Sequence, residues 1–334
     1  MKIPPSAHFT PVPLAQRFNT DNQRLPDTLK PPEDKSVLYG PQSFQGIPFE
    51  LGLPDQANVI LLADREVRID LDSIQASYVI FVHVVEDRIT NYLDGLADFA
   101  ADGNELGQLV SEYSLEYTDG ATAVTPILRR FAIQQSRIRW GASPFAAVPI
   151  FKHEAYASSS EDQALGRWSA AGYGRGETRV SSGRDSRPEK LWLYALPNPH
   201  PDKPIRQIIC TPKEERSAIY AISYTGVQEH PLRPGVRQKL RLALPEGAKL
   251  NALGTLDGAE IDLGLVISAR AVLEYDRERW LGQEPNVQPV QSNQSVVIEY
   301  LAHPMAKLYI PTGPDSHAVY DLAQANDGAV ATIN

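Results

Sequence analysis

The sequence predicts an all-β protein, an antiparallel jelly-roll β-sandwich followed by a second, smaller β domain. Two observations lead to this prediction. Several short segments alternate apolar and polar residues with the period of two that strands require, and turn signals separate these segments. The segments do not alternate regularly with helical patterns, which favours a sandwich or jelly roll over a doubly wound α/β fold.

The clearest strand signal is an alternating segment at residues 67–72. Apolar and charged residues alternate there without a break, so Val67, Ile69 and Leu71 share one face. Asp70 lies on the opposite face. We therefore expect a half-buried strand with one face against the core and the other in water.

Two further segments, residues 113–117 and 239–244, repeat this alternation and predict half-buried strands of their own. The first is followed by Asp119 and Gly120, residues that tolerate the positive φ angles of a tight hairpin turn. The sequence therefore predicts a β-hairpin whose first strand ends near residue 117.

Fully apolar runs at residues 78–82 and 219–222 predict central strands covered on both faces. Residues 91–109 are the one plausible helix, but three glycines argue against a continuous one. We expect an irregular insertion there.

Proline and polar stretches divide the chain into parts. Residues 1–44 are proline-rich and predict an N-terminal arm, extended or partly disordered. Residues 45–227 form the predicted sandwich, and residues 238–334 the second β domain. Within the sandwich, residues 155–190 are rich in serine, glycine and arginine and lack strand periodicity. They predict a long loop, and long loops are often functional.

Composition narrows the classes of function. The chain of 334 residues has a formal net charge of -9, which argues against a nucleic-acid groove because phosphate binding depends on clustered lysine and arginine. Its length predicts about two domains. The single cysteine, Cys210, lies in an apolar run and is expected to be a small buried side chain rather than a reactive thiol.

The sequence also predicts no membrane association. No stretch approaches the roughly 20 apolar residues that span a bilayer, and the N-terminus lacks a charged region followed by an apolar one. We therefore expect a cytoplasmic protein as the sequence stands, or an extracytoplasmic one if a signal peptide has been removed.

Five motifs occur in an order that resembles a known family. The chain resembles the galactose-binding-like jelly-roll (β-sandwich) modules of large bacterial hydrolases and lyases over residues 45–226, through Gly46-Ile47-Pro48-Phe49, residues 58–62, residues 76–83, Tyr117-Thr118-Asp119-Gly120 and residues 198–205. The resemblance implies a fold whose members bind sugars or serve as structural modules packed on a catalytic domain.

The pairing with a second β domain is also similar to the non-catalytic front portion of PHP-type metal-dependent hydrolases. This similarity implies a separate catalytic domain, and no His-x-His pair occurs in the chain. None of the seven histidines has a partner at i,i+4 spacing, and one cysteine is too few for a thiolate-rich zinc site. We predict no metal and no cofactor. His83, inside an apolar strand, is expected to be a hydrogen-bonded core or edge histidine.

Carboxylate pairs are the candidates for acid–base catalysis, because glycoside hydrolysis needs two such groups across one bond. Adjacent residues on a strand point to opposite faces, so neither member of an adjacent pair can meet the other. We expect these groups to be exposed and solvated rather than catalytic. The candidates are Glu86 with Asp87, Glu214 with Glu215, and Asp315 near His317.

A sugar site needs aromatic rings, which stack on the apolar face of a pyranose, and planar polar groups that bind its hydroxyls. Two clusters offer this chemistry: Trp140 beside Arg139, and Trp168 with Tyr173 and Arg175 in the long loop. Packing anchors are the alternative interpretation of both tryptophans.

These observations favour a non-catalytic accessory or structural β-sandwich protein of a larger bacterial hydrolase system. Its expected partners are a carbohydrate and a catalytic domain or subunit. The alternative is an enzyme, a glycan-active or metal-dependent hydrolase whose site is assembled from distant loops. A stoichiometric metal in the purified chain would favour the alternative.

Overall fold

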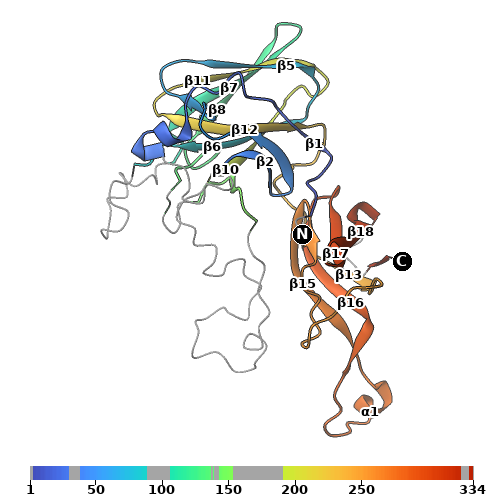
Figure 1. Ribbon diagram of the computed structural model, residues 1–334. Helices are drawn as coiled ribbons and strands as arrows, with labels where there is room; N and C mark the ends of the chain where they lie inside the picture. Colours follow the sequence, from blue (N-terminus) through green and yellow to red (C-terminus); the bar gives the residue numbers. More distant parts are fainter. Residues whose placement is uncertain are drawn as a thin grey trace. The chain divides into compact units, whose positions relative to one another are not determined.

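The computed structural model describes residues 3–29, 38–88, 106–136, 138, 143–152, 191–324 and 331–333. It is an all-β structure built from several antiparallel sheets (Figure 1), and the one α-helix among the described residues is α1 (Arg277–Leu281). The chain divides into two compact units. One is formed mainly by residues within 5–152 and 187–232, and the other by residues within 233–334.

The first unit contains two sheets. One has the strand order β1-β12-β6-β10-β9, with β4 also paired to β12, and the other has the order β5-β11-β7-β8; every pairing is antiparallel. The strands of the first sheet are β1 (Phe9–Pro11), β4 (Ile60–Leu62), β6 (Tyr78–Val85), β9 (Val148–Pro149), β10 (Trp192–Pro197) and β12 (Ser217–Thr225). Those of the second are β5 (Val67–Ile74), β7 (Leu109–Tyr117), β8 (Thr122–Leu128) and β11 (Ile205–Pro212).

The two sheets share one core. Phe81 and Val85 from β6 belong to the same buried cluster as Leu115 from β7 and Ile208 from β11. Two sheets that bury their inner faces against each other form a β-sandwich. Cys210 is also fully buried in this cluster, as its apolar surroundings predicted, and burial raises the pKa of its thiol.

The outer face of the first sheet is covered by a hairpin of β2 (Gly40–Phe44) and β3 (Ile47–Leu51). Ile47 is fully buried, and Ser223 Oγ of β12 donates a hydrogen bond to the Pro48 carbonyl. The hairpin turns at Gln45 and Gly46, which both have positive φ. The hairpin therefore covers β12. Both β6 and β12 are buried almost throughout, which confirms the central strands predicted at residues 78–82 and 219–222.

The half-buried strands predicted at residues 67–72 and 239–244 are confirmed, but the one predicted at residues 113–117 is wrong. In β7, which lies between β11 and β8 in its sheet, Ser114 is buried together with Tyr113, Leu115 and Tyr117. On β5, Ile69 and Leu71 are buried while Asp70 is exposed, so the predicted face is the core face. The predicted turn joins β7 to β8, and Gly120 adopts a φ of 84° there. The alternation of residues 239–244 recurs in β13 (Gln238–Ala243).

The described part of the proline-rich N-terminal segment contributes to the sandwich. β1 pairs with β12 in the first sheet, and Val12 and Leu14 are buried in the shared core. Short 3-10 turns follow at Asn22–Arg24 and Asp27–Leu29.

The second unit holds two smaller sheets, with orders β15-β16-β13-β19 and β14-β17-β18. Its core includes the fully buried Leu240, Val296, Ile298 and Ile310. β19 pairs with β13 in parallel. The remaining elements are β14 (Glu260–Ile261), β15 (Gly264–Glu274), β16 (Val290–Ala302), β17 (Lys307–Gly313), β18 (Ser316–Asp321), β19 (Ala331–Ile333) and a 3-10 turn at Leu322–Gln324.

Two predictions fall mostly or wholly on other parts of the chain. The long loop at residues 155–190 and the irregular insertion up to residue 105 lie outside the described residues. Within the described part of the chain, no helix has the length and apolar character needed to cross a membrane.

Candidate functional site

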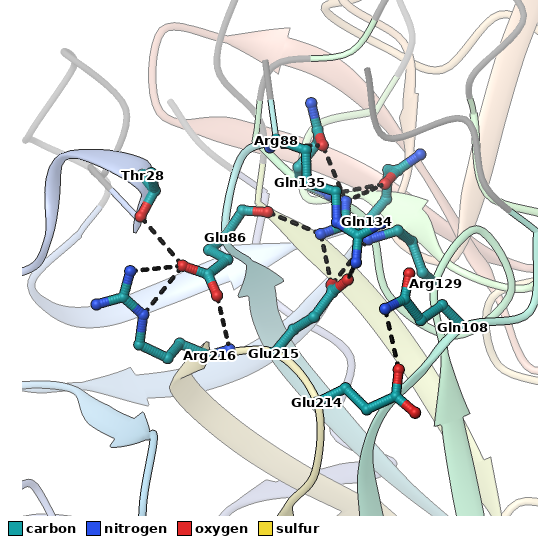
Figure 2. Close-up of polar contacts among 10 residues, drawn as sticks. All are labelled: Thr28, Glu86, Arg88, Gln108, Arg129, Gln134, Gln135, Glu214, Glu215 and Arg216. Carbon is teal, nitrogen blue, oxygen red and sulfur yellow. Dashed lines mark hydrogen bonds and ion pairs between the residues drawn. The ribbon is translucent and has the colours of Figure 1, made fainter. Parts of the chain in front are cut away.

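Three connections meet at one end of the sandwich and bring charged residues together (Figure 2). They follow β6 at Glu86, follow β8 at Arg129, and join β11 to β12 around Glu215. Each connection begins where a strand ends, and its residues are more polar than those of the strand before it. Backbone bonds tie the connections together: Val85 N–H donates to the Gln134 carbonyl at 3.3 Å, and Glu86 N–H to the Arg216 carbonyl at 3.0 Å.

A buried ion pair between Arg129 and Glu215 forms the centre of this network. The Arg129 side chain is 0% exposed and that of Glu215 is 4% exposed. Arg129 Nε and Nη2 donate to Glu215 Oε2 at 2.9 and 2.6 Å, and Arg88 contacts the other carboxylate oxygen. The remaining Arg129 donors reach the Glu86 carbonyl at 2.8 Å and Gln135 Oε1 at 2.8 Å. Such multiple bonds are what a buried charge requires.

A second ion pair joins Glu86 to Arg216 nearer the surface. Arg216 Nη2 and Nε donate to Glu86 Oε2 at 2.7 and 3.0 Å, and Thr28 Oγ1 donates to the same oxygen at 3.3 Å. Partial burial would raise the pKa of the Glu86 carboxyl, but the hydrogen bonds and charge of Arg216 outweigh burial and lower it. Glu86 is therefore held as an anion.

The network corrects the expectation for Glu215, which was predicted to be exposed and solvated. Its neighbour Glu214 does point elsewhere, and it accepts a bond from Gln108 Nε2 at 3.0 Å. The two adjacent side chains do point in different directions, as expected. Glu215, however, points into the interior, where its carboxylate is bound by Arg129. Its carboxylate and that of Glu86 are each held in an ion pair with arginine. The network is thus suited to holding three connections in place.

A tight turn after β8 continues from this network to the surface. Arg130 has a φ of 63°, a left-handed conformation that is costly for a residue other than glycine. Its N–H donates to the Ile133 carbonyl at 2.8 Å, and the Phe131 and Ala132 N–H groups donate to Leu128. The turn is therefore fixed by its own backbone bonds.

This turn presents an exposed aromatic pair. The rings of Phe131 and Phe145 lie 5.3 Å apart, and the Arg130 guanidinium carbon lies 5.7 Å from the Phe145 ring centre. Both phenylalanines are exposed. Backbone bonds hold the pair together, because Phe145 N–H donates to the Arg130 carbonyl at 2.9 Å and Ala146 N–H donates to the Phe131 carbonyl at 3.0 Å. The Phe131 and Phe145 rings provide surfaces for stacking, and the planar Arg130 cation lies beside them.

His83 supports the same turn from the core. Its Nε2 lies 3.0 Å from the Ala132 carbonyl, and its Nδ1 lies 3.1 Å from Tyr113 Oη. The carbonyl can only accept, so Nε2 carries the hydrogen and Nδ1 accepts from the tyrosine. Burial lowers the pKa of His83 to about 4, despite the opposing bond to Ala132. The expected hydrogen-bonded core histidine is confirmed.

The sugar-site candidates Arg139, Trp140, Trp168, Tyr173 and Arg175 lie outside the described residues. Their role stays a prediction.

Asp315 lies in the turn between β17 and β18 of the second unit and is exposed, as expected. His317 lies on β18 and packs edge-on against Tyr309 at 6.2 Å. Among the residues described, no group of three or more His, Cys, Asp or Glu side chains is placed to hold a metal ion.

The sequence did not predict a role for Arg129, Phe131 or Phe145. Arg129 and its carboxylate partner are 86 residues apart, and no local pattern connects them. The dipeptide Arg129-Arg130 directly after an alternating strand was the available signal. Comparisons with protein-family models and with curated proteins gave no match, so a functional interpretation depends on these residues themselves.

Proposed function

We propose that this chain is a non-catalytic accessory protein of a larger hydrolase system, and that its sandwich binds carbohydrate beside the turn after β8, where Phe131 and Phe145 are exposed. A sandwich of the galactose-binding-like jelly-roll type suits this role, because loops carried by a rigid sandwich are where such modules place binding groups.

The ion pairs of Glu86 and Glu215 with arginine support the proposal that the protein is non-catalytic. A general acid at neutral pH needs a raised pKa. The pKa of Glu86 is lowered by Arg216, and Glu215 is enclosed by Arg129 and Arg88. These groups stabilise the connections instead of transferring protons.

The carbohydrate part rests on the ring pair. Phe131 and Phe145 offer an exposed apolar surface for the face of a pyranose, and the Arg130 guanidinium carbon lies 5.7 Å from the Phe145 ring centre, where it gives this surface a positive charge. The turn below them is fixed before any ligand arrives, which reduces the entropy lost on binding. The sequence predicted a separate sugar contact at Trp168, Tyr173 and Arg175, with Trp140 and Arg139, and that prediction falls outside the described residues.

A glycan array followed by titration of the best soluble oligosaccharide tests the proposal. Phe145→Ala should weaken binding by about fivefold, since one aromatic contact contributes about 1 kcal/mol. Val124→Ala is the matched control, because Val124 is an exposed apolar residue on β8 outside the ring pair. A silent array, or equal binding by Phe145→Ala, would reject the carbohydrate site. Hydrolysis of an array glycan by the purified chain, with a metal retained, would reject the non-catalytic role.

A further inference from the structure

The larger sheet of the second unit has one face in the core and the other in water. Leu240 and Leu242 of β13, with Val296 and Ile298 of β16, are fully buried on the core side. Successive side chains of a strand alternate between the two faces, so the residues between these four point away from the core. We call this side of β15, β16 and β13 the outer face.

Two arginines lie in one row across the outer face. Arg241 of β13 and Arg270 of β15 both pair with Val297 of β16, the strand between them. Paired residues of antiparallel strands share a face, so all three side chains lie on the outer face. Both arginines are exposed, and Val297 is partly buried. Because neighbouring strands are about 4.8 Å apart, the two arginine side chains begin about 10 Å apart.

The nearest carboxylate on this face is already occupied. The next row pairs Lys239 with Glu299, and the Glu299 carboxylate is held by Arg237 at 2.6 Å and by Lys239 at 3.5 Å. Within the part of the chain that the structure describes, neither Arg241 nor Arg270 forms an ion pair or a side-chain hydrogen bond. Two positive charges held in one row without a counter-charge repel each other, so folding stability alone does not favour this arrangement.

We propose that Arg241 and Arg270 form a binding site for a tetrahedral oxyanion, a phosphate or sulfate group, held over Val297. A guanidinium group binds such an anion through two parallel hydrogen bonds. The long side chains let both guanidinium groups lean over Val297, where one anion receives a pair of donors from each side. On the neighbouring row, Ala243 pairs with Ser295, and these two small side chains leave room beside the anion.

The outer face suits a single anionic group better than a nucleic acid. The residues of these three rows include no aromatic ring on which a base could stack. The chain also has a net charge of -9, which opposes a long polyanion. A small anion meets mainly the charges near it, because charges beyond about 10 Å are screened at 0.1 M salt.

NMR titration of the full chain, carrying isotope-labelled arginine, with inorganic phosphate at low salt tests the proposal. We expect the Nε–H signals of Arg241 and Arg270 to shift together and to saturate with a dissociation constant of about 1 mM. Arg241→Gln and Arg270→Gln should each weaken binding about tenfold, because each removes one of the two donor pairs. Arg270→Lys keeps the charge but cannot donate two parallel bonds, and it should weaken binding about fivefold.

Arg277→Gln is the matched control. Arg277 is an exposed arginine of the same unit that lies on α1 and not in the sheet, so its replacement removes the same charge and should leave the affinity unchanged. All the variants should keep the unfolding midpoint of the parent chain, because the replaced side chains are exposed. Glycerol phosphate in place of inorganic phosphate identifies the source of the group: tighter binding assigns the site to an ester of a larger ligand, and equal binding assigns it to the free anion. Shifts that never saturate would overturn the proposal. So would an affinity that Arg270→Lys leaves unchanged, or one that Arg277→Gln lowers as much as Arg270→Gln, since both results describe general attraction of counter-ions.

Discussion

Protonation of His83 should destabilise the protein in mild acid. The ring is fully buried, and its pKa falls from the ordinary value of 6.5 to about 4 because burial removes the charged form from water. Between these two values the unfolded chain binds a proton that the folded chain does not. The free energy of unfolding therefore decreases as the pH falls through this window, and the stability is fully present above it.

The size of the effect follows from the two pKa values. The difference between 6.5 and about 4 corresponds to about 3 kcal/mol, reached when the pH lies below both values. At pH 5 the unfolded histidine is almost fully protonated while the folded one is almost fully neutral, so about 2 kcal/mol is lost relative to pH 8. That is a large share of the marginal stability of a domain.

Urea unfolding of the parent chain and of His83→Gln at pH 8, 6 and 5 measures this contribution. A glutamine keeps a donor for the Ala132 carbonyl and an acceptor for Tyr113 Oη, but it does not titrate. Between pH 8 and pH 5 the variant should lose about 2 kcal/mol less than the parent, and contributions from other groups cancel in the comparison. Equal losses in the two proteins would refute the reasoning, because they would mean that His83 is protonated as easily folded as unfolded.

Two further predictions concern the network and the strand register. Arg129→Met should lower the free energy of unfolding by about 3–5 kcal/mol, because it leaves Glu215 charged and buried. Replacing both residues by methionine should lower it by much less than the two single changes together. Urea unfolding of the three variants measures these differences. Leu71→Ala should cost about 2–5 kcal/mol, while Asp70→Ala should cost about 1 kcal/mol or less since its ion pair with Arg17 is exposed. The reverse order of these two costs would show that β5 presents the other face to the core.

The strands could be predicted because their signal is local. Alternation with a period of two can be recognised from consecutive residues alone. Ile69 and Leu71 therefore identified the buried face of β5 without knowledge of its neighbouring strands. The same holds for β6. Its successive residues are apolar without alternation, which predicted that both of its faces are buried. The hairpin after residue 117 was predictable because turn chemistry is local as well.

The Arg129–Glu215 ion pair and the exposure of α1 could not be predicted in the same way. The burial of Glu215 depends on Arg129, which lies 86 residues away in the sequence. No residue pattern near Glu215 predicts that an arginine will pair with it. Trp280 shows the opposite case. A tryptophan that follows a strand suggests packing against the core, but α1 lies at the end of a hairpin with no core beneath it. In both cases the outcome depends on where another segment lies.

Four consecutive residues of the turn after β8 have four different tasks. Arg129 is buried and anchors the turn to Glu215, Arg130 adopts the left-handed conformation, Phe131 faces solvent, and the carbonyl of Ala132 accepts from His83. The anchors act on one short segment, so His83→Gln and Arg129→Met should not be additive in stability. The Phe131 side chain is exposed and packs against the Phe145 ring, and it is not part of the Arg129 or His83 contacts that anchor the turn. A loss of ligand binding in Phe131→Ala at an unchanged unfolding midpoint would therefore report on binding alone, whereas the same loss in Arg129→Met would report on the collapse of the turn.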